Sequence, residues 1–295
     1  MSEAHTPLPR AVALVSCGLL AVTALSGCGG SDSDEGSGKG GGGQDEGRQQ
    51  SPAQVVQATS EKTTQAGSAR IKLTTTASSG GRSETVTGAG VMDLRDGTSR
   101  IELGQGGQRI EQRVVDQVLY QKPPEGSGGL PGGKSWLKID LQRLRDAGGK
   151  GAAQVSDPAD SFAYSKSLSE KDVKKVGTER LNGVSTTHYR VDVDVDKLAK
   201  SSPEQAKKLR ESVGDTLPMD VWIDGRGLLR RQQIELSTTA KSGGGASGNA
   251  AAARTGAKVV MDLTDFGTDV DVKAPRAADT ADMTDKAVQE SRRSA

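Results

Sequence analysis

Residues 182–196 read NGVSTTHYRVDVDVD, and this stretch decides the fold class. From Tyr189 onward, apolar residues alternate with one arginine and three aspartates, which is the period of two expected for a strand with one buried face. The Asn-Gly pair at 182–183 supplies the two positive φ angles of a type I′ turn. It therefore joins this strand to the preceding segment, 173–180, as an antiparallel hairpin.

The same alternation recurs through the rest of the chain. Ile71 and Leu73 alternate with polar neighbours, and so do Ile101 and Leu103. About nine strands in one domain favour an antiparallel sheet, because parallel strands need a helical crossover between each pair. Further candidate strands are 90–95, 110–122, 135–139, 219–224, 228–237 and 258–266.

Helices are expected at a few places between these strands. Residues 51–54 (SPAQ) and 202–205 (SPEQ) each place Ser at an N-cap, Pro at the first helical position and Gln where it can close a capping box. A third, short helix is expected over 157–168. The predicted class is therefore α+β, with one large antiparallel sheet and a few helices.

The start of the chain has the pattern of an export signal. Arg10, an apolar run over 11–25 and Ser26-Gly27 fill the charged, apolar and small-residue positions of a signal peptide. The sequence Leu25-Ser26-Gly27-Cys28 resembles a bacterial lipobox, in which the cysteine receives a diacylglycerol thioether and becomes the first mature residue. Two acyl chains anchor stably, since each buried methylene contributes about 0.8 kcal/mol and a single chain holds only marginally. Cys28 is thus the expected lipidation site.

Two alternatives to lipidation are a cut by the general signal peptidase and an uncleaved transmembrane anchor. A spanning helix needs roughly 20 apolar residues, whereas this run gives way to Gly, Ser and Asp after residue 27. The expected organisation is a lipoprotein signal peptide at 1–27, an acylated cysteine with a disordered Gly/Ser-rich tether at 28–50, one domain at 51–275 with a disordered insertion at 241–256, and a polar flexible tail at 276–295.

Composition excludes several function classes. The chain has 39 Lys and Arg against 38 Asp and Glu, with no basic stripe interleaved with aromatics, so no nucleic-acid partner is expected. Removal of Cys17 with the signal and acylation of Cys28 leave the domain without a thiol, which excludes disulfides, cysteine zinc sites and a cysteine nucleophile. His188, the one histidine of the mature chain, has no second ligand nearby and is expected to be a solvated strand residue.

Two further patterns carry no catalytic or metal site. Asp192, Asp194 and Asp196 share one face of a strand, but the Gly turn and terminal Glu of a calcium loop are missing. The glycine-rich stretches 40–43 and 104–107 are not followed by the Lys and Ser or Thr of a phosphate loop. We therefore expect no catalytic residue, no metal and no cofactor, and a protein that is not an enzyme.

The shortage of aromatic residues bears on what the sheet encloses. The chain has two Trp, three Tyr and two Phe, so few side chains of the kind that bury about 150–250 Å² each are present. A large sheet filled by small β-branched residues either packs loosely, as composition bias alone would produce, or leaves its concave face to be filled by another molecule. The sequence leaves both explanations open.

Five short markers, taken in order, resemble a known family. They are QVLYQK at 117–122, KSWLKID at 134–140, VGTE at 176–179, NGVSTTHYR at 182–190 and MDVWIDG at 219–225. With the lipobox ahead of them, they resemble the LppX/LprAFG lipoproteins of actinobacteria, relatives of the LolA-like carriers. The resemblance implies a strongly curved half-barrel whose concave face is covered by a few helices, with a hydrophobic cavity between.

Proteins of that family carry the acyl chains of lipids or glycolipids. The resemblance therefore implies a cell-membrane lipoprotein on the extracytoplasmic face that binds lipids or glycolipids and could transfer them. The alternative is an envelope sensor or adaptor of the same fold that binds a partner protein. An aliphatic lining suits flexible acyl chains, but strand side chains alternate between faces, so the sequence does not say which ones point inward. The candidate lining residues are Leu73, Met92, Leu94, Ile101, Val118, Tyr120, Trp136, Val191, Val193, Val221 and Ile223.

Overall fold

The computed structural model describes residues 50–79, 81–124, 126, 129–147, 165, 168–198, 207, 210, 214–239 and 254–293. The strands are β1 (Ser68–Ser79), β2 (Arg82–Asp93), β3 (Ser99–Gln105), β4 (Gln108–Val115), β5 (Val118–Lys122), β6 (Trp136–Asp140), β7 (Val173–Leu181), β8 (Val184–Asp194), β9 (Thr216–Asp224), β10 (Leu229–Thr239), β11 (Arg254–Thr264) and β12 (Thr280–Asp282). The helices are α1 (Pro52–Gln65), α2 (Leu141–Asp146), α4 (Val195–Leu198) and α6 (Thr284–Arg293), with 3-10 turns η1 (Pro131–Gly133), η4 (Glu170–Asp172) and η5 (Ala277–Asp279).

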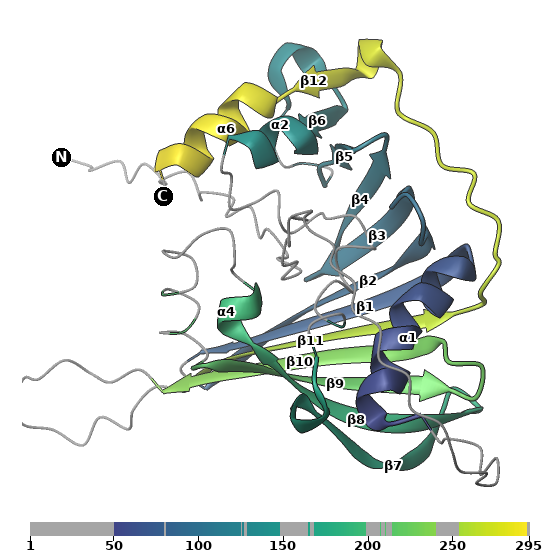
Figure 1. Ribbon diagram of the computed structural model, residues 1–295. Coiled ribbons are helices and arrows are strands. Elements are labelled where there is room, and N and C mark those ends of the chain that lie inside the picture. The colour runs from purple at the N-terminus through teal and green to yellow at the C-terminus, as the bar shows by residue number, and fades with distance from the viewer. Residues whose placement is uncertain are drawn as a thin grey trace, which may run out of the picture.

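These strands form one curved sheet in the order β12-β6-β5-β4-β3-β2-β1-β11-β10-β9-β8-β7. Neighbouring strands pair antiparallel, except that β12 lies parallel to β6. The order begins at β12 and ends at β7, so the sheet stays open, and Figure 1 shows it curving between these two edges. The predicted α+β class with a large, curved, mainly antiparallel sheet is confirmed.

The predicted hairpin between β7 and β8 is also confirmed. Asn182 and Gly183 have φ angles of 49° and 82°, the left-handed values that a type I′ turn requires. A second turn joins β9 to β10, where the Asp224 carboxylate accepts hydrogen bonds from the backbone N–H groups of Arg226 (2.9 Å) and Leu228 (3.0 Å). Side-chain acceptors of this kind fix a turn by satisfying backbone donors that the ladder leaves free.

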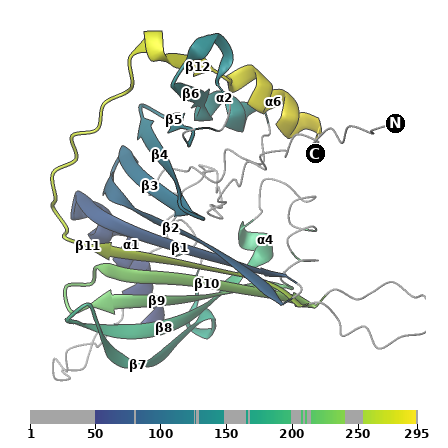
Figure 2. The same cartoon turned by 180° about the vertical axis from the view of Figure 1, so that it is seen from behind.

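Helix α1 begins as its sequence predicts and lies on one face of the sheet. The Ser51 hydroxyl accepts from the Gln54 N–H, and the Gln54 side chain accepts from the Ser51 N–H at 3.0 Å, which completes the capping box. The helix packs against β7 and β10. We call the face that it covers the inner face and the opposite one the outer face (Figures 1 and 2). The predicted helices over 157–168 and from 202 onward lie almost wholly outside the described residues.

The pairing register tells which residues share each face, because directly opposed residues of an antiparallel pair point the same way. Ile71 opposes Leu263 of β11 and Gly90 of β2, and Gly90 opposes Ile101 of β3. The core of buried apolar residues runs across these positions. It consists of Ala53, Val56, Ala69, Ile71, Leu94, Leu168, Val173, Tyr189, Val191, Val193, Leu217, Met219, Val221, Ile223, Leu229, Ile234 and Leu263.

The prediction of a polar flexible tail at 276–295 is corrected, because the structure places η5, β12 and α6 there. The Met283 N–H donates to the Lys138 carbonyl at 2.9 Å, and the Asp140 N–H donates to the hydroxyl of Thr284, which is 1% exposed. Backbone groups of β6 therefore help to hold the segment, and a polar composition does not disclose such contacts. Part of the insertion predicted at 241–256 also differs, since β11 begins at Arg254.

Candidate functional site

The inner face brings most of the candidate lining residues together. The register places Leu73 opposite Met261, Met92 opposite Ala69 and Ile101 opposite Gly90, all on the inner face. Leu94 lies just beyond β2 and is buried in the same core. In β8, Val191 opposes Met219 and Val193 opposes Leu217. In β9, Val221 opposes Tyr189 and Ile223 opposes Leu229. All four candidates, Val191, Val193, Val221 and Ile223, therefore point inward.

The predicted lining is wrong for three residues that lie on the outer face, namely Val118, Tyr120 and Trp136. Val118 opposes Asp140, and Tyr120 opposes both Lys138 and Arg113. The Arg113 guanidinium lies 4.7 Å from the centre of the Trp136 ring. Both faces of β5 and β6 carry apolar side chains, so a period of two could not choose between them. The inward apolar residues of these strands are Leu119, Leu137 and Ile139.

The inner face has a packed part and a partly exposed part. Val191, Val193 and Val221 are at most 1% exposed and belong to the core that α1 covers. By contrast, several apolar side chains of β2, β3, β4, β10 and β11 are only partly buried. We call this set the inner patch. It consists of Met92, Ile101, Ile110, Leu236, Val259 and Met261.

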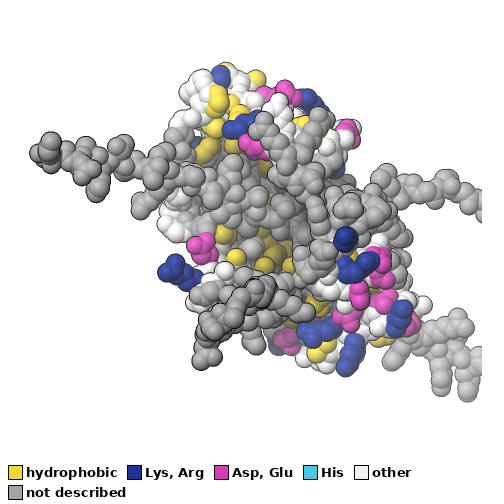
Figure 3. All heavy atoms as spheres, turned by 90° about the vertical axis from the view of Figure 1, so that its left-hand side faces the viewer, with side chains coloured by type: hydrophobic (Ala, Val, Ile, Leu, Met, Phe, Trp, Pro, Cys, Tyr) yellow, Lys and Arg dark blue, Asp and Glu magenta, His cyan; other side chains and the backbone are white. Residues whose placement is uncertain are grey.

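The inner patch is a continuous area across the sheet. Met261 opposes Leu73, Leu73 opposes Gly88, and Leu103 opposes both Gly88 and Ile110. Figure 3 shows hydrophobic side chains gathered near the middle of the molecule, with charged side chains around them. Sequence reasoning missed four residues of the inner patch, which are Ile110, Leu236, Val259 and Met261. The alternation in β4, β10 and β11 was the signal that could have found them, once the register of these strands with their neighbours was known.

The outer face carries a polar cluster around His188. Its ring is stacked on Trp222, with centroids 4.2 Å apart and planes 8° apart. Its Nε2 lies 2.8 Å from Asp220 Oδ1, and its Nδ1 lies 3.9 Å from Glu179 Oε1. The His188 side chain is 16% exposed, so its place in a strand is as predicted but the solvated environment is not.

The carboxylates of this cluster are held by further donors. Arg190 donates to Asp220 at 2.9 and 3.2 Å, and the Trp222 indole N–H donates to Glu179. Burial raises the pKa of Asp220, but hydrogen bonds from Arg190 and His188 outweigh it, so the net pKa lies below the ordinary value. Because its members come from β7, β8 and β9, the cluster braces three neighbouring strands.

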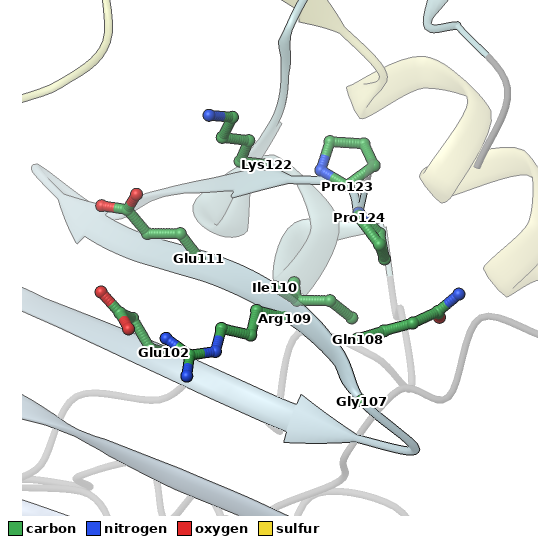
Figure 4. A pocket seen from close by; sticks show the side chains of 9 residues that line it. All are labelled: Glu102, Gly107, Gln108, Arg109, Ile110, Glu111, Lys122, Pro123 and Pro124. Atoms are coloured by element: carbon green, nitrogen blue, oxygen red, sulfur yellow. The ribbon is translucent and has the colours of Figure 1, made fainter. Parts of the chain in front are cut away.

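A groove of about 480 Å³ lies beside the β3–β4 hairpin (Figure 4). Its lining includes Glu102, Glu111, Arg109 and Lys122, so both signs of charge are present. Glu111 accepts from Arg113 at 2.9 Å and pairs with Arg100 at 2.7 Å. A lining that carries charged side chains of both signs is unfavourable for an acyl chain, so we place no lipid in this groove.

The described residues contain neither a metal cluster nor a membrane-spanning helix. Within the described residues, no three His, Cys, Asp or Glu side chains come together in a way that could hold a metal ion. No helix in the same part of the chain is both long and apolar enough to span a membrane. The expected lipidation site, Cys28, lies outside the described residues.

Comparisons with known proteins give distant relatives. No family model matches the chain. A Streptomyces griseus protein named "Uncharacterized 31.2 kDa protein in rplA-rplJ intergenic region" is 27% identical over 258 residues, covering 79% of each chain. A Streptomyces coelicolor protein named "Putative lipoprotein SCO4650" is 27% identical over 305 residues, covering 91% of this chain and 92% of that one.

Among solved structures, the chain is similar to two mycobacterial proteins. LprF from Mycobacterium bovis is 14% identical, with a TM-score of 0.43, over 77% of this chain and 97% of that one. LppX from Mycobacterium tuberculosis is 15% identical, with a TM-score of 0.39, over 74% of this chain and 98% of that one. The predicted resemblance to LppX/LprAFG proteins is confirmed as a resemblance.

Proposed function

We propose that this protein is an envelope lipoprotein that binds lipids or glycolipids through their acyl chains, using the inner patch. The observation that carries the proposal is the set of partly exposed apolar side chains on the inner face of an open, curved sheet. Fully burying one Leu, Ile or Met side chain is worth about 1.5–3 kcal/mol relative to leaving it exposed. An acyl chain laid along the inner patch would gain part of that free energy at several side chains at once.

The anchoring part of the proposal rests on the first 28 residues. Removal of 1–27 and acylation of Cys28 would hold the domain at the extracytoplasmic face of the cell membrane. The name of the Streptomyces coelicolor relative supports this assignment. Residues 28–50 would then link the anchor to α1, and a Gly/Ser-rich coil of that length spans about 25 Å. The binding site would stay close to the lipids that it takes up.

A matched pair of variants tests the proposed binding face. Met261 and Val260 are adjacent in β11 and partly buried, but Met261 points to the inner face and Val260 to the outer face. A glutamate at position 261 would place a charge in the acyl-chain path, which is strongly unfavourable without a partner. We expect Met261→Glu to lower retention of a fluorescent phospholipid at least about tenfold, because a loss of 1.4 kcal/mol already changes an equilibrium tenfold.

The control variant Val260→Glu should retain the lipid as the wild type does. Equal loss in both variants would point to misfolding, which the urea midpoint of each variant reveals. Equal retention by two folded variants contradicts the inner patch as the binding site. A wild-type chain that retains no lipid contradicts lipid binding altogether and leaves the sensor or adaptor alternative.

A further inference from the structure

Gln232 stands out on the inner face because its neighbours there are apolar. The register places it directly between Val221 of β9 and Met261 of β11. Val221 is 1% exposed and belongs to the packed core, whereas Met261 belongs to the inner patch. Gln232 therefore marks the boundary between the filled and the partly exposed parts of this face.

The side-chain carbonyl oxygen of Gln232 is buried and has no hydrogen-bond partner in the described structure. A buried polar atom without a partner is unfavourable, and such atoms are rare in folded proteins. Two other glutamines of the inner face behave differently: the Gln112 amide donates to the Gln121 carbonyl at 3.5 Å. Within the described residues, the oxygen of Gln232 is thus an acceptor without a donor.

We infer that the lipid bound on the inner patch carries a hydrogen-bond donor next to its acyl chains, which Gln232 accepts. This inference rests on the proposed function and narrows its ligand class. The free hydroxyl of a diacylglycerol or of a glycerol-linked sugar meets the requirement. A triacylglycerol does not, because its three glycerol oxygens are all esterified and it has no O–H or N–H to donate.

The test compares two lipids that differ only in this donor. The probes are radiolabelled 1,2-dioleoylglycerol and its 3-O-methyl ether, each presented in phosphatidylcholine vesicles. The protein is the full chain with Cys28→Ala, which removes the proposed acylation site, and flotation centrifugation separates it from the vesicles. We expect the hydroxyl form to bind about tenfold more tightly, since satisfying a buried acceptor is worth about the free energy of a tenfold change.

Two variants assign the preference to one side chain. Gln232→Leu should bind both probes equally, at the affinity that the methyl ether has for the Cys28→Ala chain that keeps Gln232. Gln233→Leu is the control, because Gln233 is the next residue of β10 and points to the outer face opposite Val260 and Asp220. It should keep the full preference for the hydroxyl form.

The outcomes separate this inference from the proposed function. Binding of both probes without preference by the full chain overturns the inference and leaves lipid binding intact. Binding of neither probe overturns the proposed function and the inference with it. A preference that survives Gln232→Leu shows that another group accepts the donor and overturns the role of Gln232.

Discussion

Gly90 of β2 lies so close to β3 that a β-carbon built on it would be 1.9 Å from the backbone oxygen of Arg100. At Gly88, two residues earlier, a β-carbon would be 2.7 Å from the Leu103 side chain. Both glycines point to the inner face. Glycine in a strand marks a bend or a close approach of another backbone. These two positions therefore allow β3 and β4 to turn toward the inner face, which forms the wall that carries Ile101 and Ile110.

Gly90→Ala should destabilise the protein by about 1–3 kcal/mol, because the added methyl forces β2 and β3 apart. Urea unfolding followed by tryptophan fluorescence measures the change in free energy. The control is Gly104→Ala in β3, where the nearest atom to an added β-carbon is at 3.7 Å, an ordinary contact. If the two variants have the same urea midpoint, the close approach at Gly90 does not exist in solution.

The brace around His188 predicts a pH dependence through Asp220. The folded-state pKa of Asp220 is below the ordinary value of 3.8, so its ionised form stabilises the fold. That stabilisation is present above the unfolded-state pKa and disappears as the pH falls through the folded-state pKa. Asp220→Asn should therefore be less stable than the wild type at pH 7, and the two should converge as the pH falls below about 4.

Urea midpoints at pH 7 and pH 3 check this expectation. Asp192→Asn serves as the control, since Asp192 lies on the same face of β8 as Arg190 and is exposed. It should follow the wild type at both pH values. An unchanged gap between wild type and Asp220→Asn from pH 7 to pH 3 would show that the Asp220 carboxylate does not carry the effect.

Membrane anchoring depends on one cysteine. Cys28→Ala should move the protein from the membrane fraction to the soluble fraction, because no acyl chains can be attached. Cys17→Ala is the matched control, since Cys17 lies in the segment that we expect to be removed, and that variant should stay with the membrane. Retention of Cys28→Ala in the membrane fraction would instead support the transmembrane anchor.

The hairpin at 182–183, the capped start of α1 and the antiparallel sheet could be predicted because local residues determine them. Asn182 adopts the left-handed conformation and Ser51 caps its helix as their residue types require. Strand faces could be predicted only where apolar and polar residues alternate cleanly. In β5, Val118, Leu119 and Tyr120 form an unbroken apolar run, so the direction of each was decided by pairing with β4 and β6.

The C-terminal segment could not be predicted because its contacts join residues far apart in the chain. Thr284 accepts from the backbone of Asp140, and Arg143 donates to Asp285 at 2.7 Å. Neither residue type signals such a contact by itself. The same reason applies to Gln232, whose place among apolar neighbours depends on the register of three strands.

The most direct test of lipid binding is native mass spectrometry of the full chain, purified with mild detergent from an actinobacterial host. Lipid binding at the inner patch predicts a non-covalent adduct of discrete mass, which organic extraction identifies as a diacyl lipid with a free hydroxyl. Met261→Glu should lose this adduct, and Val260→Glu should keep it. The contradicting result is a mass that the polypeptide and its covalent acyl groups explain alone, in protein that has been kept in mild detergent throughout.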